Sequence, residues 1–106
     1  MDAPPEIQRL GRLIAEAFHP ERIVLFGSRA RGGAGVVAGA DVDLLVLMEF
    51  EGSAIAAAGR IRAMLPADIA VDVVVRRPQE YRLRLDGGDP FAREVDATGI
   101  VLYSAA

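Results

Sequence analysis

The stretch FGSRARGGAGVVAGADVDLLVL, residues 26–47, joins a glycine-rich segment to an apolar run that carries two aspartates, Asp41 and Asp43. The apolar run predicts a buried strand, because short apolar runs bounded by turn residues are typical of sheets covered on both faces. Residues two apart in a strand point to the same side, so the two aspartates would share one face. The two aspartates therefore either lie on a solvent-exposed face of the strand or bind a ligand.

The sequence around this stretch predicts alternating helices and strands. Apolar residues recur at helical spacing before Pro20, and Ser53 is a typical N-cap for a second helix that ends before Pro66. Four short β-branched runs predict strands. This order favours an α/β fold, a sheet of about four strands flanked by helices. The expected segments are helices over 7–18 and 55–65, a helical turn over 28–31, a loop over 32–39, strands over 22–26, 41–48, 69–75 and 99–103, and weaker helical patterns over 81–85 and 90–96.

Length and composition narrow the class of protein. With 106 residues, the chain is expected to form a single domain, residues 1–106. The net charge is −3 and all 12 basic residues are arginine, so a broad cationic face for duplex nucleic acid is not expected. The chain has no cysteine, which excludes disulfides and cysteine-ligated zinc. The sequence starts without a secretory signal and its apolar runs are too short to span a bilayer, so a cytoplasmic protein is expected.

A third aspartate extends the pattern. Asp72 is flanked by valines in another predicted strand, and if the two strands are neighbours it joins Asp41 and Asp43 in a cluster of three carboxylates. Such a cluster needs positive charge, because carboxylates repel one another and lose hydration when partly buried. Magnesium prefers oxygen ligands, and two ions can share a few aspartates. The pattern predicts a two-magnesium site, and the alternative is an exposed strand face or pairing with Arg29 and Arg31.

The residues after the first strand predict a phosphate site. Gly27 lets the backbone turn sharply, and Ser28 places a hydroxyl beside free amide groups at a helix start. Arg29 and Arg31 are able to bind phosphate oxygens through bidentate hydrogen bonds. The alternative for the two arginines is a solvated surface pair.

Two other glycine patterns are excluded as nucleotide motifs. GAGVVA, residues 33–38, has the spacing of a dinucleotide fingerprint but lacks a strand before it and a helix after it. GSRARG, residues 27–32, lacks the Gly-Lys-Ser/Thr end of a P-loop. His19, the single histidine, is interpreted as a helix C-terminal residue.

Gly27-Ser28, Asp41-x-Asp43 at the start of an apolar strand, and Asp72 in VDVVV together resemble the DNA polymerase beta-like nucleotidyltransferase superfamily. FGSRARG and DVDLLVL are especially similar to the minimal nucleotidyltransferases, and the likeness covers residues 23–103. The spacer between Ser28 and Asp41 has 12 residues, longer than is usual in that family, and Ala40 stands where serine is common. The resemblance implies the small nucleotidyltransferase fold, with a mixed sheet.

The resemblance also implies roles for the motif residues. Gly27 and Ser28 would bind the triphosphate of a nucleotide such as ATP, Asp41 and Asp43 would ligate both magnesium ions, and Asp72 would ligate the catalytic one. The implied reaction is in-line attack of an acceptor hydroxyl on the α-phosphorus of a nucleoside triphosphate, with pyrophosphate leaving. Asp72 would accept the proton of the attacking hydroxyl.

The minimal members of that superfamily resemble antitoxins that add AMP to a tyrosine of a HEPN-type ribonuclease toxin, so a cognate toxin is the expected partner. This chain shows no further segment that would hold a primer, a transfer RNA or an antibiotic. Two alternatives stay open: a catalytically silent binding module that neutralises its partner by contact, and nucleotidyl transfer to a small-molecule hydroxyl, for example within a homodimer.

Overall fold

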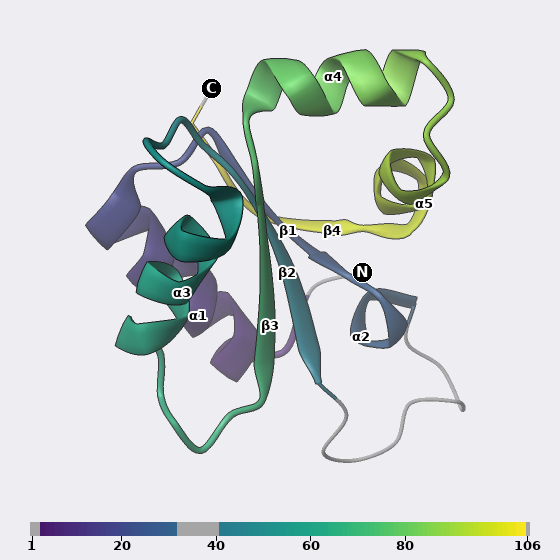
Figure 1. Ribbon diagram of the computed structural model, residues 1–106. Coiled ribbons are helices and arrows are strands. Elements are labelled where there is room, and N and C mark those ends of the chain that lie inside the picture. The colour runs from purple at the N-terminus through teal and green to yellow at the C-terminus, as the bar shows by residue number, and fades with distance from the viewer. Residues whose placement is uncertain (1–2, 32–40, 106) are drawn as a thin grey trace.

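The computed structural model describes residues 3–31 and 41–105, and in this part of the chain four strands form one sheet with helices on both faces (Figure 1). The strands are β1 (Arg22–Phe26), β2 (Val42–Leu47), β3 (Val71–Arg76) and β4 (Ile100–Ser104). Their order across the sheet is β3-β2-β1-β4. β2 and β3 are parallel, whereas β1 is antiparallel to both β2 and β4. The expected α/β fold with a four-stranded mixed sheet is therefore confirmed.

Two helices cover one face of this sheet, α1 (Pro5–Phe18) and α3 (Ala54–Met64). Apolar residues on one side of α1 are buried, and the left-handed backbone of His19 ends the helix, with its N–H bonded to the Ala15 carbonyl at 3.0 Å. Ser53 caps α3 by accepting a hydrogen bond from the amide of Ala56 at 3.1 Å. The core on this face contains Ile7, Leu10, Ile14, Leu44, Val46, Ala57 and Ile61.

The other face is covered by α4 (Pro78–Asp86) and α5 (Pro90–Thr98). Each helix has a proline in its first turn, where the missing N–H breaks no helical hydrogen bond. This second, smaller core contains Val24, Leu45, Leu47, Tyr81, Ala92 and Val95. α2 (Ser28–Arg31) is a single turn directly after β1, at the end of the sheet where β2 and β3 begin.

The structure corrects three boundaries. The weak helical patterns over 81–85 and 90–96 are two complete helices: α4 begins earlier than expected, at Pro78, and α5 begins at Pro90 as expected but continues to Thr98. The second strand begins at Val42 and the third at Val71, so Asp41 precedes its strand. The expected loop over 32–39 lies outside the described residues. None of the helices in the described ranges is long and apolar enough to cross a membrane.

Candidate active site

Asp43 and Asp72 are directly paired in the sheet. In the parallel register of β2 and β3, Asp43 lies opposite Asp72 at the amino ends of the two strands. Neighbouring strands are about 4.8 Å apart, and paired residues point to the same side of a sheet. The two carboxylates therefore start from adjacent backbone positions on one face. The expectation that these strands are neighbours is confirmed.

Asp41 stands apart from this pair. It precedes β2 by one residue and is exposed, whereas Asp43 is half-buried. Within residues 3–31 and 41–105, no three acidic or histidine side chains are gathered into a group that could already hold a metal ion. The three-carboxylate metal site therefore stays a prediction, resting on the paired positions of Asp43 and Asp72.

Gly27 brings the backbone after β1 against the Asp43 carboxylate. Its φ of 76° lies in the left-handed region that glycine adopts without strain. A Cβ at this position would collide with Oδ2 of Asp43 and lie 3.2 Å from its Cγ. The preceding residue, Phe26, is the antiparallel partner of Asp43 in the sheet. Any larger residue at position 27 would displace the carboxylate, so Gly27 sets its position.

The residues expected to bind phosphate begin beside the same carboxylate. Ser28 opens α2 and is half-buried, as is Arg29. The amide of Ala30 bonds to the Gly27 carbonyl at 3.1 Å, which closes the turn. The side chain of Arg31 lies outside the described residues. The structure thus brings Gly27, Ser28 and Asp43 to one end of the sheet, and their phosphate and metal roles stay predictions.

Comparison with known protein families gives a match to the model described as a nucleotidyltransferase domain, over residues 7–87. This chain belongs to the nucleotidyltransferase domain family. The match supports a transferase that moves nucleotidyl groups, and it spans the glycine turn and all three aspartates. A search of curated proteins gave no match.

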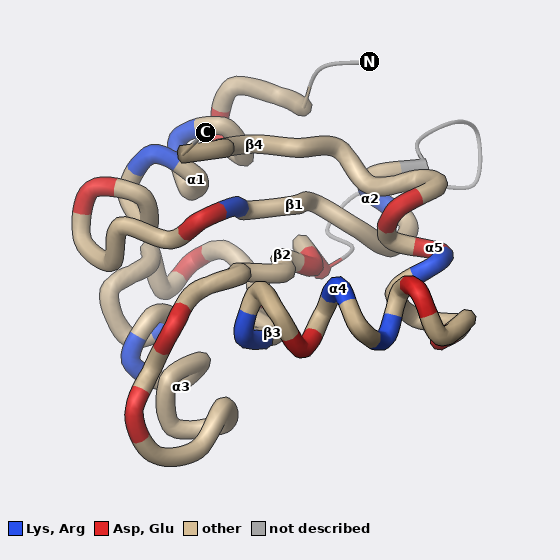
Figure 2. The backbone as a smooth tube through the Cα atoms, turned by 90° about the horizontal axis from the view of Figure 1, so that it is seen from above, with Lys and Arg blue, Asp and Glu red and all other residues tan. Residues whose placement is uncertain are grey.

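The donor set of this nucleotidyltransferase domain fits a magnesium ion. Carboxylate oxygens are the ligands that magnesium prefers, and Asp43 and Asp72 supply them from two paired strands. Like charges directly opposite each other in a sheet are destabilising, so a cation at this place would offset their repulsion. Figure 2 shows acidic residues at the start of β2, close to α2. The two carboxylates therefore fit a divalent cation as ligands.

The face of the sheet that carries these carboxylates continues under α4 and α5. Leu45, Leu47 and Val74 follow Asp43 and Asp72 at strand spacing, and all three pack with Tyr81. Tyr81 is buried, and its hydroxyl donates a hydrogen bond to the Ala92 carbonyl at 3.3 Å. Burial raises the pKa of Tyr81, Asp96 raises it further, and Arg22 lowers it in part. Tyr81 is therefore a packing residue of this second core.

Arg76 is a residue of the same face that the sequence did not single out. It lies at the carboxyl end of β3, two strand repeats beyond Asp72 on the same side of the sheet. A signal was present, because Arg76 and Arg77 directly follow the strand expected over 69–75. If the strand had been expected to extend to Arg76, strand periodicity alone would have placed Arg76 on the same face as Asp72.

Proposed function

We propose that this chain is a metal-dependent nucleotidyltransferase that moves AMP from ATP to a hydroxyl of a partner protein. The observation that carries the proposal is the direct pairing of Asp43 with Asp72, with Gly27 packed against the Asp43 carboxylate. Family membership supports nucleotidyl transfer in general. The donor, the metal and the acceptor are the proposed parts.

The residues of the candidate site would have different roles in the reaction. Asp41, Asp43 and Asp72 would hold magnesium, which when bound supplies the positive charge that offsets the triphosphate. Gly27 and Ser28 would hold the phosphates, with help from Arg29 and Arg31. The acceptor oxygen bonds to the α-phosphorus, the bond from that phosphorus to the bridging oxygen breaks, and pyrophosphate leaves. Asp72 would take the proton of the acceptor hydroxyl.

We further propose that the acceptor is a tyrosine of a HEPN-type ribonuclease toxin and that this chain is its antitoxin. The support is the likeness of FGSRARG and DVDLLVL to minimal nucleotidyltransferases. Docking of a partner would supply the positioning that a small domain does not provide by itself, and such positioning contributes a large part of catalysis.

The test is intact-mass spectrometry of the cognate HEPN-type protein after incubation with this chain, magnesium and ATP. The toxin should gain the mass of one adenylyl group, and tyrosine should carry it. Asp43→Asn should abolish the gain while the chain still folds. A toxin that is neutralised equally well by both variants without gaining mass would instead establish a binding module that acts by contact.

A further inference from the structure

A cleft of about 340 Å³ lies at the β3 edge of the sheet, on the side covered by α4 and α5. Its walls are the carboxyl end of β3, α4, the start of α5 and the segment before α3. The side chains that matter for its chemistry are two aromatic rings, three arginines and a glutamate: Phe50, Phe91, Arg76, Arg77, Arg84 and Glu80.

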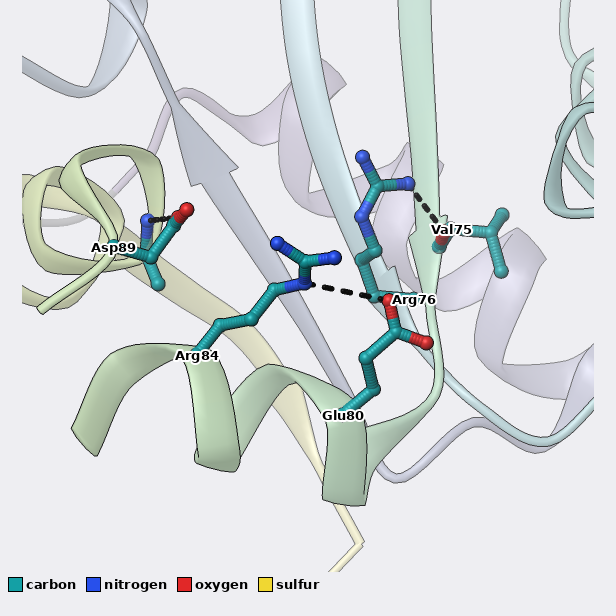
Figure 3. A network of polar contacts seen from close by, with 6 residues as sticks. Val75, Arg76, Glu80, Arg84 and Asp89 are labelled. Carbon is teal, nitrogen blue, oxygen red and sulfur yellow. Dashed lines mark hydrogen bonds and ion pairs between the residues drawn. The ribbon is translucent and has the colours of Figure 1, made fainter. Parts of the chain in front are cut away.

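Two of the arginines enter the cleft from different elements. Figure 3 shows the guanidinium group of Arg84 projecting from α4 towards the sheet, and that of Arg76 turned back along β3 to the Val75 carbonyl. Nη1 of Arg76 donates to the Val75 carbonyl at 2.9 Å, and Nε of Arg84 lies 3.5 Å from Oε1 of Glu80. Each of these contacts uses one of the five N–H donors of a guanidinium. Both arginines line the same cleft and keep further N–H donors for an anionic ligand.

Arg77 forms a wall of the cleft. Its guanidinium stacks on the Phe50 ring, 4.0 Å from the centroid, and Nη2 donates to the Phe50 carbonyl at 3.0 Å. These contacts fix the segment before α3 against the start of α4. This wall of the cleft is therefore preformed.

Arg76 is the arginine of the cleft whose charge is least compensated. Arg77 lies 3.9 Å from Glu49 and Arg84 lies 3.5 Å from Glu80, whereas Arg76 takes part in no ion pair within residues 3–31 and 41–105. Oδ2 of Asp89 already accepts the amide of Ala92 at 2.9 Å as the cap of α5. Figure 2 shows both basic and acidic residues along α4. Guanidinium groups bind carboxylates and phosphates through paired hydrogen bonds. The ligand should therefore carry a carboxylate or a phosphate.

The cleft and the candidate active site lie at opposite ends of β3. Arg76 lies four residues beyond Asp72 on the same strand and the same face, a distance of about 13 Å at strand spacing. Phe91 makes an edge-to-face contact with Phe26, with ring centroids 5.2 Å apart, and Phe26 is the strand partner of Asp43. A bound chain could therefore reach both places.

The surroundings of the cleft favour a protein ligand over a small anion. Leu83 is 65% exposed and lines a neighbouring hollow together with Arg77 and Glu80, two residues that also line the cleft. A free phosphate gains nothing from exposed apolar side chains. Protein interfaces, in contrast, combine arginine and aromatic residues with apolar contacts.

We propose that this cleft binds an aspartate or glutamate side chain of the acceptor protein. Arg76 and Arg84 hold the carboxylate, and Leu83 contacts apolar residues beside it. The acidic residue lies about four residues from the modified hydroxyl if the bound segment is extended. That the occupant is the acceptor rests on the proposed function, and the cleft thereby selects which protein segment is modified.

The probe is a fluorescein-labelled peptide that contains leucines, a tyrosine and, four residues away, a pair of glutamates. The matched control peptide has glutamines in place of the glutamates. Binding is measured by fluorescence anisotropy without nucleotide, so that the result does not depend on transfer. The glutamate peptide should bind, and the glutamine peptide should bind at least about tenfold more weakly, as expected for loss of a charge-assisted hydrogen bond.

The variants separate this cleft from general charge effects. Arg84→Ala should weaken the glutamate peptide about tenfold, and Arg76→Ala/Arg84→Ala should weaken it further. Arg82→Ala is the matched control, because Arg82 lies on the same helix but pairs with Glu21 at 3.0 Å outside the cleft. Leu83→Ser should weaken binding of the peptide while leaving the dissociation constant of tripolyphosphate unchanged. Circular dichroism confirms that each variant is folded.

The outcomes distinguish this inference from the proposed function. Asp43→Asn should bind the glutamate peptide like wild type although it loses transfer. Equal binding of both peptides, an equal effect of Arg82→Ala and Arg84→Ala, or binding of tripolyphosphate without binding of the glutamate peptide would each overturn the inference. The last result would assign the cleft to a small phosphate ligand.

Discussion

At the scale of single residues, Gly27 and Asp43 depend on each other. Gly27 has a positive φ and leaves no room for a Cβ, because the Asp43 carboxylate occupies that space. The glycine was expected from the sequence as a sharp turn after the first strand, whereas its contact with Asp43 depends on how β1 and β2 pair. Substitution of this glycine should therefore affect both stability and the site.

Gly27→Ala should destabilise the fold by about 1–3 kcal/mol, through backbone strain and the collision with Asp43. Urea unfolding measures the loss. Gly52→Ala is the matched control, because Gly52 has a φ of 78° but nothing within 4 Å of its added Cβ. If both substitutions cost the same, the contact with Asp43 contributes nothing. In an Asp43→Ala background, Gly27→Ala should cost less than in wild type.

Tyr81 should make stability fall at alkaline pH. Its pKa in the folded state is raised above 10.0, mainly by burial, so the folded protein holds this proton more tightly than the unfolded chain. The resulting stability is complete below pH 10 and is lost as pH rises from there through the folded pKa. The chain has no lysine or cysteine to obscure the effect. Urea unfolding across this range should show a smaller loss for Tyr81→Phe, with Tyr103→Phe as control; identical curves for Tyr81→Phe and wild type would contradict this.

At the scale of elements, the sequence best predicted the helices and strands whose residue pattern has a single cause, the burial of apolar side chains. α1 buries one apolar side at helical spacing, and β1 is a β-branched run buried on both faces, so both were predicted within a residue or two. α4 buries little besides Pro78 and Tyr81, so its residues lack an apolar period. Its extent follows from Pro78 at its start and from packing over Leu45 and Leu47. Propensity and periodicity therefore could not define it.

Asp89 should account for the start of α5. Its carboxylate accepts the Ala92 amide at 2.9 Å, and loss of such a cap costs about 1 kcal/mol. Asp89→Ala should show this loss in urea unfolding, whereas Asp89→Asn keeps an accepting oxygen and should lose much less. Ser53→Ala provides a reference at the start of α3. An Asn variant as unstable as the Ala variant would mean that the charge of Asp89, rather than its cap, stabilises the helix.

At the scale of the whole molecule, the order of the strands in the sheet determines which residues form the candidate active site. The pattern Asp41-x-Asp43 and Asp72 could be recognised in the sequence, but no periodicity tells which strands are neighbours. The order β3-β2-β1-β4 pairs Asp43 with Asp72 and leaves Asp41 just before its strand. The same topology brings together four separate segments of the chain to form the cleft lined by Arg76, Arg77 and Arg84, which explains why the sequence did not indicate this cleft.

The pairing of two carboxylates should cost stability when no cation is present. Asp72→Asn should raise the free energy of unfolding by about 0.2–1 kcal/mol in magnesium-free buffer, because it removes a like charge directly opposite Asp43. Added magnesium should reduce or reverse this difference. A variant less stable than wild type in the absence of magnesium would contradict repulsion between the two side chains.

The central claim is that Asp43 and Asp72 form a site for magnesium and a nucleoside triphosphate, and the melting temperature with and without both ligands tests it most directly. At a hundredfold excess over the dissociation constant, a ligand that binds the folded state alone stabilises it by about 2.7 kcal/mol. Magnesium with ATP should therefore raise the melting temperature of the wild type and of Asp86→Asn, a charge-matched control on α4, but not of Asp43→Asn/Asp72→Asn. An unchanged wild-type melting temperature, or an equal rise in the double variant, would contradict the claim.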